Sequence, residues 1–364
     1  MEDRAMRRSL PVFLAVLIAI SAFAPAVTGQ STDGPDSSVE CEFPLEVTDA
    51  TGETVTLEDP PDSVVALQPS DARTMFEIGA EDRLVGLPDN PATSDLEMGD
   101  RTAVTDGYEV LPERVVDLDP DLVVAANTTD GETIAQLRAA GLTVYQFDDA
   151  ESIADVRDNI LTTGRLTGEC DGAEATVDWM DEQLAIIDRA LEGTDRPLAY
   201  YAMGDGYTAG SGTFIHDAMT TAGLEPVADR AGIEGYGSIN PETVVNENPE
   251  WIVYPDDREE PPIHESIRAT TASRNDNVIA VDANRMNQPA PGIVSTIIDL
   301  VETVHPEAYE QVSDDLEAAP ENGDGSSDET DTDAASGESA IPGFGVPVAV
   351  VTLLATLGIA TRRR

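Results

Sequence analysis

The sequence predicts an α/β fold of two similar lobes with parallel-rich sheets, joined by a single long helix, with a ligand cleft between the lobes. Three observations support this prediction. One short pattern occurs twice, apolar runs alternate with helical segments, and a long helical stretch separates the two series. Strands that alternate with helices over short loops are typical of parallel sheets covered by helices.

The repeated pattern occupies residues 107–124 and 235–253, and residues 111–124 align with 240–253 without a gap. Each copy reads as a Gly-Tyr loop, a short helix with Pro at its first position and Glu in its first turn, a break, and a buried strand. The identical pairs include Pro112/Pro241, Glu113/Glu242, Val115/Val244, Val116/Val245 and Pro120/Pro249. One unit used twice predicts two similar lobes.

The first lobe is expected over residues 42–150. It opens with a β-hairpin that turns at Ala50-Thr51-Gly52, and Ser70 is a candidate helix cap. The remaining elements outside the repeat are predicted as strands at 64–67, 84–87 and 142–147 and helices at 71–79 and 132–140.

Residues 151–192 are expected to form the connecting backbone helix. Gly164, Gly168 and Gly172 interrupt it, so it is either one kinked helix or two helices in series. The second lobe is expected over 193–318. Its strands are predicted at 197–201, 251–254 and 278–281, with a helix after Gly210-Ser211-Gly212-Thr213 and a closing helix at 291–304.

The charge is strongly acidic. The 364 residues contain 71 Asp and Glu against 20 basic residues, all of them Arg, for a net charge of −51. Self-repulsion on that scale is screened within about 3 Å at molar salt, so we interpret the surface as adapted to a high-salt milieu. A cation-binding or disordered acidic protein is the alternative, although 41% apolar residues argue against global disorder. Nucleic acid is a poor partner for this field.

Both ends of the chain carry membrane-related signals. Residues 1–29 read as an export signal peptide, in which Arg7-Arg8 precede an apolar run and fit either a twin-arginine or a plain Sec signal. Residues 319–340 read as an acidic Ser/Thr/Gly linker, and 341–364 as an apolar segment that ends in three arginines.

The tail resembles the PGF-CTERM sorting signal of haloarchaeal surface proteins, with Pro342, Gly343 and Phe344 as the motif. The resemblance implies removal of the helix and attachment of a lipid near the motif. A permanent transmembrane anchor is the alternative. Either arrangement predicts that the folded part lies on the extracellular face of the cell membrane. In that environment Cys41 and Cys170, the only cysteines, are expected to form one disulfide.

The span from Val64 to His305 resembles the substrate-binding proteins of ABC importers for cobalamin and iron-siderophores, a periplasmic-binding family with a helical backbone. The matching segments, in family order, are VVALQPSDARTMFEIGAEDRLVG, LPERVVDLDPDLVVA, LRAAGLTVYQF, AGSGTFIHDAMTTAG and NPETVVNENPEWIVY. The resemblance implies a non-enzymatic, monomeric receptor that captures its ligand between the lobes and delivers it to the transmembrane subunits of an ABC permease.

The same resemblance suggests roles for residues in the repeat. Glu113 and Glu242, one in each lobe, match positions that dock onto arginines of the permease; otherwise each merely favours a helix N-terminus. Tyr108 and Tyr236 match loops whose aromatic residues flank a corrin ring; otherwise they pack locally. Other ligand-binding candidates, on loops expected to border the cleft, are Tyr207, Asn127, Met286, Gln288 and Arg285.

Few arginines fall on these loops, and anionic siderophores call for several. The sequence therefore favours cobalamin or a related corrinoid, with a ferric siderophore or haem as the alternative ligand. A cell-envelope enzyme or structural protein is the alternative of a different class. His216, His264 and His305 lack metal-ligand spacing, and Ser211 lacks a nucleophile-elbow pattern, so neither a metal, a cofactor nor catalysis is predicted.

Overall fold

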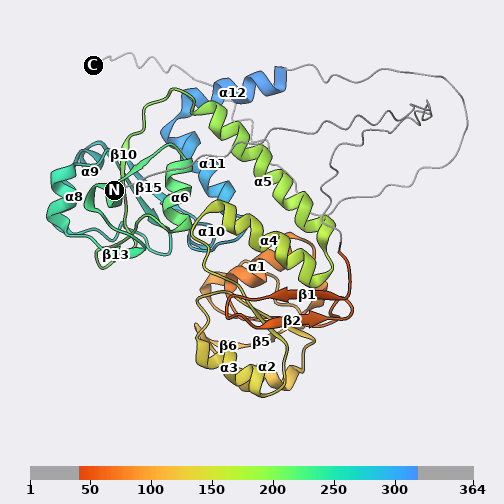
Figure 1. Cartoon of the computed structure of the whole chain (residues 1–364). Coiled ribbons are helices and arrows are strands. Elements are labelled where there is room, and N and C mark those ends of the chain that lie inside the picture. The colour runs from red at the N-terminus through yellow and green to blue at the C-terminus, as the bar shows by residue number, and fades with distance from the viewer. Residues whose placement is uncertain (1–40, 319–364) are drawn as a thin grey trace, which may run out of the picture. The chain divides into compact units, whose positions relative to one another are not determined.

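The computed structural model describes residues 41–318, and the predicted signal peptide, linker and PGF-CTERM segment lie outside them. The described residues form two α/β lobes joined by a helical segment, as the sequence predicts. Figure 1 shows the first lobe in orange to yellow and the second in green to blue, with the helices α4 and α5 running from one to the other. None of the helices within residues 41–318 is long and apolar enough to span a membrane.

The sheet of the first lobe has five strands, and every neighbouring pair is parallel. In spatial order the strands are β5 (Thr102–Ala103), β4 (Leu84–Leu87), β3 (Val64–Ala66), β8 (Leu122–Ala125) and β9 (Val144–Gln146). The sheet of the second lobe has four strands, also parallel throughout. In spatial order they are β12 (Glu225–Pro226), β10 (Leu198–Tyr201), β14 (Trp251–Pro255) and β15 (Val278–Val281).

The inner strands of both sheets are buried on both faces. Val64 and Ala66 of β3 face a core that continues into the connecting helices, whereas Val65 packs on the opposite side of the sheet. This alternation follows from the two-residue period of a strand. The first of these cores extends without interruption through Met180 of the connecting helices to Ile297 in the second lobe. The lobes are therefore joined by shared packing as well as by the chain.

Helices cover the two sheets as parallel topology requires. In the first lobe they are α1 (Pro69–Glu77), η1 (Glu81–Arg83), η2 (Pro91–Thr93), α2 (Pro112–Leu118) and α3 (Gly131–Ala139). In the second lobe they are α6 (Phe214–Thr221), α7 (Val227–Ala231), α8 (Pro241–Glu247), η3 (Glu265–Ala269), α9 (Thr271–Asn275), α10 (Ala283–Met286), α11 (Ile293–Val304) and α12 (Pro306–Ala318). The sequence did not predict α12.

The repeat found in the sequence is also a repeat in three dimensions. Helices α2 and α8 have equal length, begin with Pro, and carry Glu113 and Glu242 in their first turns. Each ends at a left-handed residue, Asp119 with φ 45° and Asn248 with φ 54°, and each leads into a central strand. Asn248 and Asp119 belong to the residue types that tolerate this conformation best after glycine.

Three antiparallel strand pairs accompany the sheets. The predicted first hairpin consists of β1 (Leu45–Thr48) and β2 (Thr54–Leu57). The Gly-Tyr loops belong to the other two pairs. Strands β6 (Thr105–Asp106) and β7 (Glu109–Val110) place Tyr108 in their turn, and β11 (Tyr207–Ala209) pairs with β13 (Tyr236–Ser238).

The connecting segment is two helices in series, α4 (Ile153–Thr167) and α5 (Cys170–Ala190), instead of a single long helix. The break occurs at Gly168, whose φ of +79° suits glycine and ends α4. A second glycine sets the position of α5, because a Cβ at Gly172 would lie 1.9 Å from the Ile78 carbonyl oxygen. The end of α1 is thereby packed directly against the backbone of α5.

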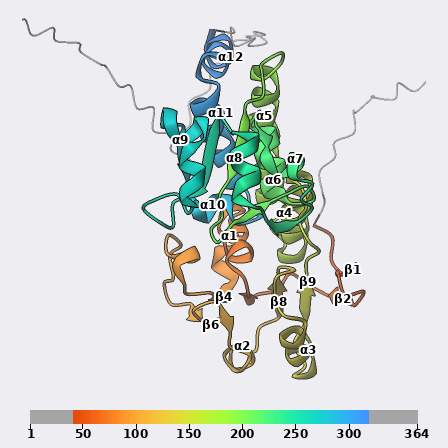
Figure 2. The same cartoon turned by 90° about the vertical axis from the view of Figure 1, so that its left-hand side faces the viewer.

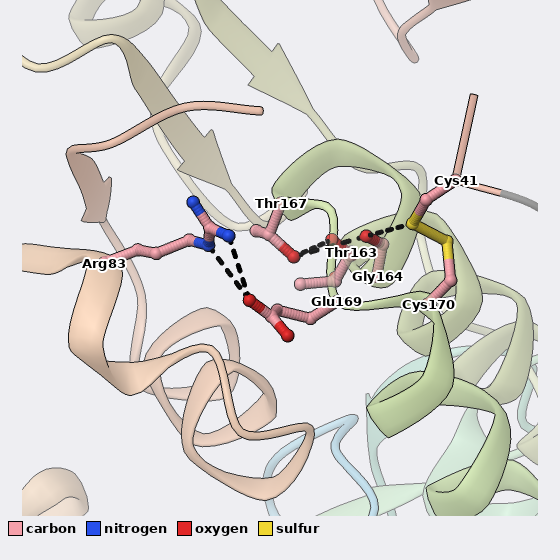
Figure 3. Close-up of a disulfide and its surroundings, with 7 residues drawn as sticks. All are labelled: Cys41, Arg83, Thr163, Gly164, Thr167, Glu169 and Cys170. Carbon is pink, nitrogen blue, oxygen red and sulfur yellow. Dashed lines mark hydrogen bonds and ion pairs between the residues drawn. A yellow bond between two sulfur atoms is a disulfide. The ribbon is translucent and has the colours of Figure 1, made fainter. Parts of the chain in front are cut away.

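The junction of α4 and α5 is fastened to the first lobe (Figure 3). Cys170, the first residue of α5, forms the predicted disulfide with Cys41. Beside it, Arg83 Nε and Nη2 both donate to Glu169 Oε1, at 3.1 and 3.0 Å, and Arg83 Nη1 donates to the Pro61 carbonyl at 2.8 Å. The start of the described chain, η1 and the helix junction are therefore held together.

The predicted cap of α1 is wrong by two residues. Ser70 is buried within the first turn, and the N-cap is Gln68, which forms a capping box with Asp71. Pro69 explains the shift, because proline is favoured at the first position of a helix. The shift matters for the site, since it places Asp71 where its carboxylate receives backbone N–H groups.

Candidate functional site

A cleft of about 510 Å³ lies between the two lobes. Most of its wall comes from the loops and helices that follow the strands β3, β8, β9, β14 and β15. Open parallel sheets usually bind ligands at the carboxyl ends of their strands. Its volume falls in the usual range for small-molecule sites. The lining residues are Gln68, Pro69, Ser70, Asp71, Thr74, Pro91, Ala92, Tyr108, Ala126, Asn127, Thr128, Phe147, Asp148, Asp149, Ala150, Asn159, Thr163, Asp256, Asp257, Ala283, Asn284, Asn287, Gln288 and Pro289.

Side-chain amides are the commonest hydrogen-bonding groups in this cleft. The Asn287 Oδ1 accepts a hydrogen bond from the Tyr201 hydroxyl at 2.9 Å, which leaves its NH₂ group available. The side chains of Asn127 and Asn159 have no hydrogen-bond partner among the described residues. Because an amide both donates and accepts, this wall suits a ligand that itself carries many amide groups.

The charged groups of the lining are all carboxylates. Asp148 and Asp149 come from the first lobe and Asp256 and Asp257 from the second, and all four are exposed. No arginine is among the described residues that line the cleft. One of these charges is partly neutralised by Arg258, which donates to both carboxylate oxygens of Asp257 at 2.7 and 2.8 Å and lowers the pKa of that carboxyl. An anionic ligand would meet repulsion here.

Asp71 lies at the floor of the cleft and is the one lining carboxyl that is buried. Its Oδ2 accepts hydrogen bonds from the backbone N–H groups of Ala126 at 2.9 Å and Gln68 at 3.1 Å. It thus joins the loop after β3 to the loop after β8. Burial raises the pKa of Asp71 to about 7, against the opposing effect of these two hydrogen bonds.

Two exposed tyrosines lie at or near the cleft. Tyr108 lines it and is 70% exposed, the highest value among the exposed large apolar side chains of residues 41–318. Tyr236 lies outside the lining and is half-exposed. Burial, and then the charge of Asp149 in the opposite lobe, raise the pKa of Tyr236 to about 12. The charge of Asp149, which lines the cleft, thus acts on Tyr236, and the two tyrosines come from different lobes.

Only some of the remaining predicted ligand residues line the cleft. Asn127 and Gln288 line the cleft, as Tyr108 does. Tyr207 and Arg285 lie outside the lining, and the Arg285 guanidinium is 3.6 Å from the Asp282 carboxylate. Met286 is fully buried in the hydrophobic core, so we leave it out of the proposed site. Met286 is the last residue of the short helix α10, and its apolar side chain packs inward.

Sequence reasoning missed several lining groups, notably Asp71 and the aspartate pairs 148–149 and 256–257. The two aspartate pairs could have been predicted from their positions, because both follow closely after strands of parallel sheets. The contributions of Asn159 and Thr163 had no such signal, since they lie on α4 in the predicted backbone helix.

The two glutamates predicted to dock onto a permease are exposed and make no hydrogen bond or ion pair through their carboxylates within residues 41–318. Glu113 begins α2 and Glu242 begins α8, so each lobe presents one carboxylate at an equivalent place. The three histidines do not meet. His216 Nε2 is 2.7 Å from Asp229, His264 caps η3 and His305 faces the Gly223 carbonyl, and the described residues contain no cluster suited to a metal.

The fold and the cleft agree with a family match. The periplasmic binding protein family matches residues 64–284, which include both sheets and almost the whole cleft. The chain belongs to this family.

Three individual proteins show what this family member is similar to. A cobalamin-binding protein of Halobacterium salinarum is 38% identical over 308 residues, which cover 81% of this chain and 83% of that protein. An uncharacterized ABC transporter substrate-binding lipoprotein of Bacillus subtilis, YvrC, is 26% identical over 84% of this chain and its own full length. The crystal structure of Helicobacter pylori CeuE in an Ni-His complex has a TM-score of 0.65 at 20% identity, covering 75% of this chain and 92% of its own, and shows the shared fold.

The position of Asp71 predicts an unusual pH dependence of stability. The raised pKa means that, as the pH increases, the unfolded chain releases this proton near the ordinary pKa of 3.8, whereas the folded protein keeps it until about pH 7. The contribution of Asp71 to stability is thus present at pH 4 and lost by pH 7. The substitution Asp71→Asn keeps an oxygen for both N–H groups and removes the titration.

We therefore compare the free energy of unfolding of Asp71→Asn with that of the wild type at pH 4.5 and at pH 8. We expect the difference to shift in favour of the variant by roughly 2–4 kcal/mol from the lower to the higher pH, since one pKa unit is worth about 1.4 kcal/mol. Chemical denaturation at both pH values in molar KCl measures the difference. A difference between the two proteins that is the same at both pH values would contradict the raised pKa.

Proposed function

We propose that the protein is the extracellular solute-binding component of an ABC importer, which captures cobalamin or a related corrinoid between its lobes and delivers it to the membrane permease. The cleft carries this proposal: its wall is rich in amides, contains carboxylates and no arginine, and has an exposed tyrosine at the rim. A corrinoid is a large flat ligand with many amide side groups, which matches such a wall.

Three further points support the proposal. The family consists of binding proteins, and the Halobacterium salinarum relative, with 38% identity, is a cobalamin-binding protein. The Bacillus subtilis relative is an ABC transporter substrate-binding lipoprotein. The carboxylates of the cleft disfavour anionic siderophores, which need cationic groups around them. A monomer that binds without catalysis is the simplest form of this function.

The route to the membrane follows from the same proposal. Export through the predicted signal peptide and anchoring through Pro342, Gly343 and Phe344 would hold the receptor at the extracellular face of the membrane, near its permease. The exposed carboxylates of Glu113 and Glu242 would then bind arginines of the two transmembrane subunits, one lobe to each. In molar salt such pairs contribute only if the interface excludes water, because exposed charges are screened within about 3 Å.

Ligand binding is tested first by titration calorimetry of the purified protein with cyanocobalamin in molar KCl. We expect saturable binding with one site, and a loss of affinity of about tenfold for Tyr108→Ala, since one buried aromatic contact contributes about 1–1.5 kcal/mol. Tyr108→Phe is the matched control, which keeps the flat ring and should bind almost as tightly. A folded sample that shows no saturable binding would refute the corrinoid assignment and favour haem or a ferric siderophore.

Docking is tested by the double substitution Glu113→Gln/Glu242→Gln, which removes both charges without changing side-chain size. We expect uptake of cobalamin by cells that depend on this protein to be lost, while the affinity of the purified protein stays unchanged. The control is Glu132→Gln/Glu265→Gln, which removes two exposed first-turn carboxylates, one from each lobe, outside the repeat. Uptake that survives the first pair, or fails equally with the second, argues against docking through the repeated glutamates.

A further inference from the structure

Gln288 lines the cleft, but its amide group is already occupied. Its Oε1 accepts a hydrogen bond from Arg73 Nε at 3.2 Å, and its Nε2 donates to the Ala92 carbonyl at 2.9 Å. Arg73 and Ala92 belong to the first lobe, whereas Gln288 follows α10 in the second. The side chain is 6% exposed. Gln288 therefore joins the two lobes and has little capacity left for a ligand.

Arg73 is held equally firmly on its own side. Its Nη1 and Nη2 donate to the two carboxylate oxygens of Asp95 at 2.8 and 2.9 Å, and its side chain is 7% exposed. This bidentate ion pair fixes the plane of the guanidinium, and it lowers the pKa of Asp95. The third nitrogen, Nε, is thereby directed at Gln288. A lysine at position 73 could not make this set of bonds, because it has a single donor nitrogen.

The loop that carries Gln288 is also tied to the second lobe. The Tyr201 hydroxyl of β10 donates to Asn287 Oδ1 at 2.9 Å, one residue before Gln288. Helix α10, which precedes this loop, lies against η2 of the first lobe, and Figures 1 and 2 both show α10 beside α1 where the lobes meet. A change in the distance between the lobes would therefore have to break the contacts of Gln288.

We propose that Arg73, Asp95 and Gln288 form an inter-lobe clasp that fixes the width of the cleft before the ligand arrives. Arg73 bonds to Asp95 and Gln288, and Gln288 bonds to Arg73 and the Ala92 carbonyl. Arg73 and Gln288 are both almost fully buried, so the contact costs little rearrangement when a ligand binds. The clasp stabilises the binding-competent separation of the lobes. Gln288 is thus a positioning residue, and the ligand-binding part of this inference rests on the proposed function.

The lobe separation can be measured without any ligand. Two exposed sites, Gln136 in α3 and Asn275 in α9, are replaced by Cys and given nitroxide spin labels, since both native cysteines are in the disulfide. Pulsed electron spin resonance then gives the distribution of inter-lobe distances. We expect a single narrow distribution for the wild-type background and a broadened or shifted one for Gln288→Leu, which removes both hydrogen bonds at nearly constant volume. Arg73→Met should have the same effect.

The matched control is Arg138→Met. It removes another partly buried ion pair, that of Arg138 with Asp49, which lies wholly within the first lobe. We expect this variant to be less stable than the wild type and to keep the narrow distribution. An unchanged distribution in both Gln288→Leu and Arg73→Met, or an equal broadening in Arg138→Met, would overturn the clasp.

Binding kinetics with cyanocobalamin separate positioning from direct contact. If only part of the population has the competent cleft, the apparent affinity falls by that fraction. We expect Gln288→Leu to slow association by about tenfold and to leave the dissociation rate close to that of wild type. Faster dissociation with unchanged association would mean that Gln288 contacts the ligand and would overturn its positioning role. A broadened distance distribution in a protein that binds no cyanocobalamin would support the clasp and refute the proposed ligand instead.

Discussion

The close packing of α1 is the constraint on which the rest of the structure depends. Six consecutive residues of this helix, 70–75, are buried, and its end lies against α5 so tightly that only glycine fits at position 172. The start of α1 supplies Asp71 to the floor of the cleft, and its next turn supplies Arg73 to the clasp. One helix therefore sets the connecting helices, the floor of the site and the contact between the lobes.

The chemistry of the cleft is well matched to a protein with a net charge of −51. Ion pairs at an exposed surface weaken in molar salt, whereas hydrogen bonds from amides and contacts with an aromatic ring depend little on ionic strength. The free amides of Asn127 and Asn159 and the ring of Tyr108 are groups of this second kind. The Arg73–Asp95 ion pair has a structural role, and only its guanidinium is shielded from the solvent, since the Asp95 side chain is 51% exposed.

Much of the fold could be predicted from sequence because its signals are local. The repeat predicted α2 and α8 with their following strands, and the apolar runs predicted the strands of the two sheets. The site was less predictable, since it depends on which loops meet. Tyr108 and Asn127, predicted from their places beside strands, line the cleft, whereas the Met286 side chain is buried in the core. The role of Gln288 could not be predicted, because its partner Arg73 is 215 residues away and lies in the other lobe.

We propose that the cleft between the lobes is the corrinoid site. Crystals of the protein grown with cyanocobalamin and measured at the cobalt absorption edge test it most directly, because the anomalous signal marks the metal independently of any fitted ligand. We expect one strong cobalt peak at the cleft, beside Tyr108 and facing the loop at 284–289. A peak on another surface, or an empty cleft in crystals whose protein binds cyanocobalamin in solution, would show that the corrinoid does not bind between the lobes.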